Sequence, residues 1–398
     1  MINLPKNELC TGCGSCGYNC PKNAISFNED SIGCMYPNID ESKCVKCHKC
    51  ERNCPVLNPP NSTEPQIAYA AWSNNSKNRC NSASGGVAYE FYHYAFNHGY
   101  KVIGAVQETD MSVKLKIAEK KEDIEKFRNS KYVFSELYST YQAISDVLQS
   151  NKVLFIGLPC QVAAVKKTFR NHENLLLVEI LCHGVTPLAY LRQHISHIES
   201  ETGKKTSYMY FRDPIVGTHN FAFSLYEDTQ KCFYSKKVNE GDSYQYGYHS
   251  GVTYRPNCYL CTFATPKRTG DIVLSDFWGL GRIKPCDYSS QDVSCVLIIT
   301  SKGETFFKTI ALEKKIYIER RPLDEAFIGN KRLLFPTHRT SEAIKFNLKI
   351  KRSKGNFEQS IKELAINHYK KENLPLLVKF IVRVWNKMQR VVKMRKNE

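Results

Sequence analysis

The chain has 398 residues, a hydrophobic fraction of 42% and a formal net charge of +17. This length predicts two or three domains with a sizeable core. The residues before Cys10 lack the apolar core of a signal peptide, and no run of 18 apolar residues would span a membrane. Seventeen cysteines in this context indicate metal binding in a reducing cytoplasm rather than a disulfide framework.

Eight cysteines form two matching sets within the first 55 residues. Each set has the spacing C-x2-C-x2-C-x3-C-P, which is typical of bacterial ferredoxins with two [4Fe–4S] clusters and not of zinc sites. The fourth cysteine of each set ligates the other cluster. We therefore assign Cys10, Cys13, Cys16 and Cys54 to one cluster, and Cys44, Cys47, Cys50 and Cys20 to the other. Residues 1–58 are predicted to form an α+β ferredoxin-like domain, in which Cys34 is a free thiol.

A proline-rich segment at 56–65 reads as a linker, and a strand is expected at 66–72. The small residues Ser84, Gly85 and Gly86 then precede a helix that begins near Val87, and Lys101 to Val106 reads as a strand. A helix N-terminus of this kind can bind the phosphate of a cofactor. The alternative is an ordinary glycine turn with a serine cap.

Two strand–turn–helix units follow. The first has a strand at 152–156 and a helix at 162–169, and the second has a strand at 175–181 and a helix at 187–198. Consecutive units of this type indicate a parallel α/β sheet. Each turn contains a cysteine, Cys160 or Cys182, just past the carboxyl end of its strand, where open α/β sheets bind ligands.

The later segments read as further strands around one CxxC pair. Strands are expected at 207–211 and 221–225, and a buried strand at 295–300. Cys258 and Cys261 form the CxxC pair, and a strand that begins at Gly270 ends in an acidic, aromatic turn.

These segments together resemble the coenzyme F420 hydrogenase/dehydrogenase beta-subunit family, with a ferredoxin fused in front. The matching segments are Ser84-Gly85-Gly86, Lys131-Tyr132-Val133, Gly157-Leu158-Pro159-Cys160-Gln161, Cys182-His183-Gly184, Cys258-x-x-Cys261 and Gly270-Asp271…Asp276-Phe277-Trp278-Gly279. They occur in family order between about residues 66 and 307. The resemblance implies an α/β, mixed-sheet iron–sulfur flavoprotein domain at 66–345.

With this resemblance in view, we expect a third [4Fe–4S] cluster on Cys160, Cys182, Cys258 and Cys261. Taken alone, Cys160 and Cys182 would more often be buried thiols, and one CxxC could be half a zinc site or a redox pair. Three other cysteines compete for the fourth ligand position, of which the last lies in an apolar strand and is expected in the core: Cys232, Cys286 and Cys295.

Clusters carry one electron and hydride carriers two, so the resemblance implies a flavin, FAD or FMN, between them. Its phosphate would lie on Ser84, Gly85 and Gly86. Lys131 is a candidate to place positive charge near the flavin or an acidic substrate, although a solvated lysine explains it equally well. His183 and Asp276 are candidate proton donors, and a structural role for the His183 ring remains open.

The basic charge is concentrated in a helical tail at 346–398. Residues 345–398 carry a net charge of +11, which leaves +6 for the rest. Apolar and basic residues alternate at helical spacing from Leu376 to Lys396, which predicts an amphipathic helix. This helix either contacts the inner face of a membrane or docks on the protein's own body. Nucleic-acid binding is not expected.

The sequence therefore predicts a cytoplasmic oxidoreductase that passes electrons between [4Fe–4S] clusters, a flavin and a hydride carrier or a reducible small-molecule substrate. Its expected partners are a redox protein or a hydride-carrying coenzyme. One alternative is a non-enzymatic electron-transfer subunit that serves a separate catalytic partner. Another is an inert scaffold that uses its clusters for stability.

Overall fold

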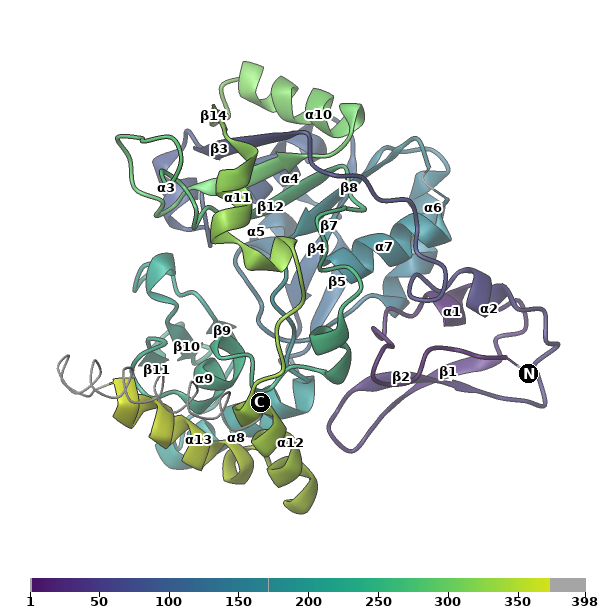
Figure 1. Ribbon diagram of the computed structural model, residues 1–398, viewed down its shortest axis with the longest axis vertical. Helices are drawn as coiled ribbons and strands as arrows, with labels where there is room; N and C mark the ends of the chain where they lie inside the picture. The colour runs from purple at the N-terminus through teal and green to yellow at the C-terminus, as the bar shows by residue number, and fades with distance from the viewer. Residues whose placement is uncertain (1, 171, 373–398) are drawn as a thin grey trace, which may run out of the picture.

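The computed structural model describes residues 2–170 and 172–372 and consists of three units (Figure 1). The N-terminal unit is small and lies beside the others. The central unit is a nine-stranded mixed sheet with helices on both faces, and the third unit combines a three-stranded sheet with long helices. In the described part of the chain, no helix is long and apolar enough to cross a bilayer.

The N-terminal unit is built around one antiparallel hairpin. Its elements are α1 (Ser15–Tyr18), β1 (Ile25–Glu29), β2 (Met35–Ile39) and α2 (Lys49–Arg52). The two short helices contact each other across the unit, and each begins within one set of cysteines. The predicted α+β ferredoxin region is confirmed at this level.

The central sheet has the strand order β14-β3-β13-β12-β8-β7-β4-β5-β6. Its strands are β3 (Ile67–Ser73), β4 (Lys101–Gln107), β5 (Val113–Ile117), β6 (Ser135–Glu136), β7 (Val153–Gly157), β8 (Leu175–Ile180), β12 (Ile272–Asp276), β13 (Ser294–Ile298) and β14 (Ile316–Arg321). Neighbours β4, β7, β8 and β12 are parallel, while β13, β14 and β5 pair antiparallel. The sheet is therefore mixed, with a parallel centre.

Helices bury both faces of this sheet. They are α3 (Ser76–Cys80), α4 (Val87–Asn97), α5 (Ile124–Phe127), α6 (Tyr141–Leu148), α7 (Pro159–Thr168), α10 (Ser301–Leu312) and α11 (Leu323–Gly329). Phe91 of α4 and Phe307 of α10 pack with Leu154 and Ile156 on one face. Phe155 points to the other face and packs with α6 and α7. This explains why β7 and β8 read as continuous apolar runs.

The third unit contains β9 (Tyr208–Tyr210), β10 (Phe223–Tyr226), β11 (Cys232–Lys236), α8 (Leu188–Thr202), α9 (Ser243–His249), α12 (Ser341–Arg352) and α13 (Phe357–Glu372). Phe346 of α12 and Phe357 of α13 are buried in its core with Leu191 of α8. The first part of the basic segment is thus packed against the body. The amphipathic helix predicted at 376–396 lies outside the described residues.

Candidate functional site

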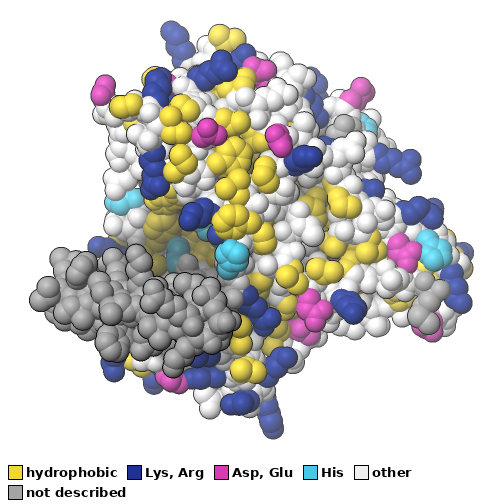
Figure 2. Space-filling view, viewed as in Figure 1, with side chains coloured by type: hydrophobic (Ala, Val, Ile, Leu, Met, Phe, Trp, Pro, Cys, Tyr) yellow, Lys and Arg dark blue, Asp and Glu magenta, His cyan; other side chains and the backbone are white. Residues whose placement is uncertain are grey.

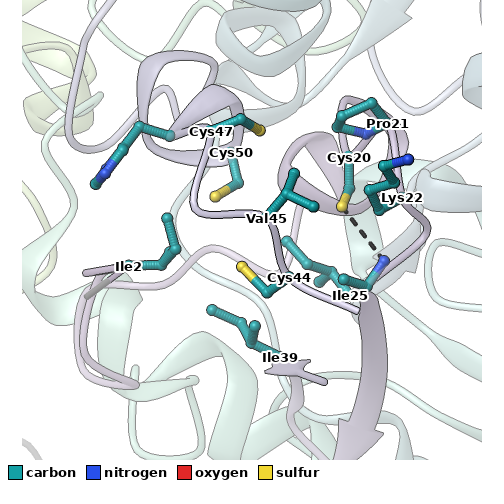
Figure 3. Close-up of a pocket in the computed structure, with 12 residues that line it drawn as sticks. Ile2, Cys20, Pro21, Lys22, Ile25, Ile39, Cys44, Val45, Cys47 and Cys50 are labelled. Carbon is teal, nitrogen blue, oxygen red and sulfur yellow. Dashed lines mark hydrogen bonds between the residues drawn. The ribbon is translucent and has the colours of Figure 1, made fainter. Parts of the chain in front are cut away.

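The eight ferredoxin cysteines surround two separate cavities. The wall of one contains Cys20, Cys44, Cys47 and Cys50, together with apolar residues such as Ile25 (Figure 3). The wall of the other contains Cys10, Cys13, Cys16 and Cys54, with Phe27 and Pro37. The structure therefore brings the cysteines together in the same two sets that the spacing predicted, each with three ligands from one run and one from the other.

Both cysteine runs use the left-handed backbone conformation at matching positions. Gly12 and Gly14 have φ values of 67° and 81°, and the equivalent residues in the second run are Lys46 at 55° and His48 at 58°. A non-glycine residue pays a conformational cost for such a φ value. That both runs adopt it indicates that wrapping the loop around its cavity, rather than the residue type, sets this geometry.

The donor chemistry of these cavities fits iron–sulfur clusters. Burial raises the pKa of Cys10, Cys50 and Cys54, and it raises the pKa of Cys13 to about 12. Soft thiolates in an apolar wall are the ligands that such clusters use. Because a thiol must be deprotonated to bind iron, the positive iron ions would supply the charge that these buried thiolates need.

A third group of cysteines converges between the ferredoxin unit and the sheet. Cys160 is the second residue of α7, Cys182 follows β8, and Cys258 and Cys261 lie at a short 3-10 helix (Pro256–Leu260). Burial raises the pKa of Cys160 strongly, and its neighbours Cys261, Cys182 and Cys258 raise it further. Burial likewise raises the pKa of Cys258 to about 12. The four thiols are each only partly exposed and influence one another, and as donors they fit a [4Fe–4S] cluster.

The three competing cysteines lie in other parts of the fold. Cys232 is exposed on strand β11, where its thiol donates to Tyr234 O at 3.3 Å. Cys286 lies in the loop after β12 and donates to Tyr288 O at 3.4 Å. Cys295 is fully buried in β13 and packs in the sheet core.

A buried ion pair supports the loop that follows the CxxC pair. Glu179 of β8 and Arg268 are each 1% exposed in their side chains. The Arg268 Nε donates to Glu179 at 2.9 Å, and Glu179 also accepts the Thr269 and Gly270 amides at 2.7 Å. The pair therefore fastens the backbone after Cys261 to the centre of the sheet.

A large cavity opens at the carboxyl edge of the parallel strands. Its volume is about 460 Å³, within the usual range for cofactor and small-molecule sites. Residues that follow β7, β8 and β12 line it, among them Leu158, Cys182 and Trp278. This is the edge of an α/β sheet where ligands are expected.

The loop before α4 forms one end of the cavity. Gly86 is the N-cap of α4 with φ of 81°, and Ser84 lies in the cavity wall. The Ser84 hydroxyl donates to Val293 O at 3.1 Å, and the Gly85 amide donates to the Ser294 hydroxyl at 3.0 Å. A side chain at Gly85 would lie 2.5 Å from Ala71 O. The loop is therefore held tightly against the sheet edge.

An arginine lies beside the helix N-terminus at this end. The Arg128 guanidinium pairs with the Glu125 carboxylate at 3.2 Å and lies 3.5 Å from the centre of the Tyr89 ring, and Arg128 and Tyr89 line the cavity. A cation beside the first amides of a long helix favours a phosphate-bearing group. The cavity end around Ser84, Gly86 and Arg128 therefore fits the phosphate of a flavin.

Lys131 also lines the cavity, but its ammonium group is already engaged. Its Nζ donates to the carbonyl oxygens of Arg128 at 2.8 Å and Lys126 at 2.9 Å. Burial lowers the pKa of Lys131 to about 7. The side chain thus holds its own loop in shape, and a role toward the flavin or the substrate stays a prediction.

The other end of the cavity combines an ion pair with an aromatic cluster. Asp276 pairs with Arg212 at 3.0 Å, and the Arg212 guanidinium lies 4.3 Å from the centre of the Phe221 ring. Trp278 stacks on Phe221 and remains 45% exposed. These flat side chains, next to a guanidinium, form a wall suited to a planar substrate.

Two histidines complete this end. Burial lowers the pKa of His183, and the Arg332 guanidinium acts in the same direction. Burial lowers the pKa of His249 to about 4, with His183 and Arg212 adding to the effect. Both rings are therefore neutral at pH 7 and can donate or accept a hydrogen bond. A proton-donor role for His183 or Asp276 stays a prediction.

The cysteine sites and the cavity follow one another in space. The Ser15 hydroxyl of the first cysteine run lies 2.9 Å from the Thr168 hydroxyl of α7, the helix that also carries Cys160. Cys182 of the third group lines the large cavity. Arg255 connects the units, since its guanidinium donates to Thr11 O at 2.7 Å. The third cysteine group thus lies between the ferredoxin unit and the cavity at the sheet edge.

Sequence reasoning missed Arg128, Arg212, Phe221, His249 and Arg255. No local sequence pattern marks any of them, and their place in the site depends on contacts with distant segments, such as those of Arg212 with Asp276 and of Arg255 with Thr11. Glu179 did carry a signal, because a single carboxylate inside the apolar run Leu175–Ile180 needs a buried partner.

Comparison with known proteins agrees with this architecture. Residues 150–325 match the family model for the C-terminal part of the beta subunit of coenzyme F420 hydrogenase/dehydrogenase, and residues 9–58 match the 4Fe-4S dicluster domain. The chain is 52% identical over 43 residues to a probable ferredoxin of Methanosarcina thermophila, covering 11% of this chain and 67% of that protein.

Two further similarities are weaker. The chain is 32% identical over 75 residues to an uncharacterized polyferredoxin-like protein of Methanocaldococcus jannaschii, covering 16% of this chain and 45% of that protein, so it spans less than half of that relative. A chain of the F420-reducing [NiFe] hydrogenase complex from Methanosarcina barkeri aligns over 76% of this chain and 92% of its own, with 18% identity and a TM-score of 0.47.

The dicluster match gives the N-terminal unit two [4Fe–4S] clusters, and the match to the later residues covers most of the sheet strands and the third cysteine group. The predicted resemblance is confirmed. Residues 150–325 therefore form a domain of the coenzyme F420 hydrogenase/dehydrogenase beta-subunit family of oxidoreductases, and a two-cluster ferredoxin domain at residues 9–58 precedes it.

Proposed function

We propose that this protein is an iron–sulfur flavoenzyme that transfers electrons between its ferredoxin unit and a small reducible molecule bound in the large cavity. The observation that carries the proposal is the order of the sites: the first cysteine run packs on α7, which carries Cys160, and Cys182 lines the cavity. A structural role for the clusters alone would not require a cofactor-sized cavity at the end of this series.

The two ends of the cavity would bind different groups. Ser84, Gly86 and Arg128 would hold the phosphate of FAD or FMN, and the aromatic end would hold the substrate. A bound flavin would supply the exchange between single electrons and electron pairs. The neutral rings of His183 and His249 can hold a proton near the substrate, while Asp276 keeps Arg212 in place. Coenzyme F420 is the first substrate to test.

Cofactor content after purification without oxygen tests this proposal. We expect about 12 iron ions per chain from three [4Fe–4S] clusters, together with one flavin. Replacing Cys160 or Cys258 with serine should lower iron to about 8 per chain, and the ferredoxin clusters should still give an electron paramagnetic resonance signal after reduction with dithionite. Cys295→Ser, at a core position away from the clusters, is the matched control.

Activity is tested separately from content. Protein loaded with its cofactors should reduce a small substrate with reduced methyl viologen as the electron source. A protein that contains flavin but exchanges electrons with no small molecule would be a relay for another subunit, and the proposed enzymatic function would be wrong.

A further inference from the structure

An open groove lies where the ferredoxin unit meets the sheet domain. It is separate from the cofactor cavity and is lined by the ends of α1, α2 and α7, whose ribbons are next to one another in Figure 1. Its lining comes from the ends of these helices and from the linker, and consists of Asn19, Lys49, Arg52, Asn53, Pro59, Pro60, Asn61, Lys166, Lys167, Thr168 and Arg170.

The charge of this groove has a single sign. Five of the lining residues are lysine or arginine, and none of them is aspartate or glutamate. Lysine and arginine side chains also occur over the face shown in Figure 2, but there acidic side chains lie among them. Outside the basic tail the chain carries only +6. Five cations in one concavity are therefore a local concentration.

Two of the five basic side chains form hydrogen bonds to backbone carbonyl oxygens of the protein itself. The Lys166 Nζ donates to Thr269 O at 2.8 Å and to Asn61 O at 3.1 Å, and Arg52 donates to Cys47 O at 2.9 Å. The other three are Lys49, Lys167 and Arg170, and none of them forms an ion pair within the described residues. These three are available to an external anion.

The floor of the groove is part of the cluster-binding backbone. Asn19 and Asn53 directly precede Cys20 and Cys54, the ligands that cross from one run to the other cavity. The Ser15 hydroxyl donates to Asn53 O at 3.0 Å and lies 2.9 Å from the Thr168 hydroxyl. A molecule bound in this groove would therefore contact the backbone next to one cysteine ligand of each cluster.

We propose that this basic groove is the docking site of a small acidic one-electron carrier protein. A [4Fe–4S] cluster accepts one electron and no hydride, so the partner at this place must be a one-electron carrier rather than a nicotinamide or deazaflavin. The groove is open rather than enclosing, as expected for a protein surface. Its uniform positive charge selects an acidic partner and speeds its encounter.

The electron balance of each docking event is simple. The reduced carrier loses one electron and this chain gains one, with no bond made or broken. Two such events supply the pair that a two-electron substrate takes in the cavity. The inference deepens the proposed function by naming its electron partner, but it depends only on the two ferredoxin clusters and not on the flavin or the third cluster.

Binding of a recombinant flavodoxin, an acidic flavin protein, provides the test. The variant Lys167→Glu/Arg170→Glu reverses two unpaired cations and avoids every cysteine-bearing loop of the ferredoxin unit. The matched control, Lys345→Glu/Lys362→Glu, makes the same charge change on α12 and α13. At low ionic strength we expect flavodoxin to bind the groove variant at least about tenfold more weakly than the wild type, and the control variant nearly as well as the wild type.

Two accompanying measurements make the result decisive. Raising the salt concentration should bring the Kd values of wild type and groove variant together, because ions screen exposed charges. Reduction of the clusters by reduced methyl viologen, which gives up one electron and needs no docking, should proceed equally in both, and iron content should be unchanged. These readouts hold even if no substrate is ever turned over, so failure of the proposed function is distinguishable.

Two outcomes would overturn the inference. Equal weakening of flavodoxin binding in both variants would mean that net charge, and not this groove, attracts the carrier. If inorganic tripolyphosphate binds the wild type and not the groove variant while flavodoxin binds both alike, the groove is a small-anion site and the docking proposal is wrong.

Discussion

The ion pair between Glu179 and Arg268 offers the sharpest test of how the third cysteine group is held. Glu179→Ala would leave Arg268, only 2% exposed, with the carbonyl oxygens of Phe263 and Thr265 as its remaining acceptors. It would also remove the acceptor of the Thr269 and Gly270 amides. Breaking a buried pair on one side costs about 3–5 kcal/mol.

This loss should be visible as a lower melting temperature. For a domain of this size each kcal/mol shifts the midpoint by about 2–4 °C, so we expect a decrease of at least about 6 °C in circular dichroism recorded without oxygen. The loop after Cys261 should also loosen, so iron bound per chain should fall before the protein unfolds. The exposed pair of Glu304 and Lys308 on α10 gives the control, because Glu304→Ala should cost less than about 1 kcal/mol.

The double variant Glu179→Gln/Arg268→Met separates charge from packing. It removes both charges while keeping similar volumes, and it should recover much of the loss, since a buried pair is often replaceable by uncharged residues. If Glu179→Ala melts within about 2 °C of the wild type, the buried pair does not hold the CxxC loop to the sheet and the reasoning is refuted.

Three further predictions concern other parts of the molecule. Burial disfavours a charged His194, but the carboxylates of Asp242 and Glu358 outweigh burial and raise the pKa of His194 to about 9. The stability that the charged ring contributes should therefore be complete below pH 6.5 and lost as the pH rises through about 9. Urea unfolding at pH 6 and pH 9.5 should show this loss in the wild type and not in His194→Gln. Gly85→Ala would place a methyl group 2.5 Å from Ala71 O, so flavin released on denaturation should decrease while iron content stays constant. Arg255→Met would remove the hydrogen bond to Thr11 O, and limited proteolysis should then cut the linker at 56–65 faster than in the wild type.

The parts of the fold that sequence reasoning captured have local causes. The 2-2-3 spacing of the cysteines describes a loop that wraps one cavity, and a repeat of that spacing predicts its twin. The apolar runs around Phe155 and Leu177 predict central strands, because the residues on both faces of these strands are buried. The turns with Cys160 and Cys182 then fall at the same sheet edge, as parallel strands require.

The remaining features depend on contacts between distant segments. Arg212 and Asp276 are 64 residues apart, and Arg255 and Thr11 are 244 apart. Sequence periodicity carries no information on such pairs, because an arginine that will be buried against a distant partner cannot be told apart in the sequence from an arginine on the surface. The cavity wall formed by Phe221, His249 and Trp278 also needs the third unit to be placed against the sheet, and this depends on packing of α8, α9, α12 and α13.

The contact between the ferredoxin unit and the sheet domain uses the same backbone that surrounds the first cavity. Thr11 O accepts from Arg255, Cys13 O accepts from the Tyr141 hydroxyl at 3.2 Å, and a side chain at Gly14 would collide with Tyr138. The loop that holds one cluster is therefore also the docking surface for the body. Because the first cysteine loop both surrounds a cluster site and contacts the sheet domain, separation of the two units would move Cys13 away from Cys160. A substitution that weakens the contact between the units should therefore interrupt electron transfer before it unfolds either unit.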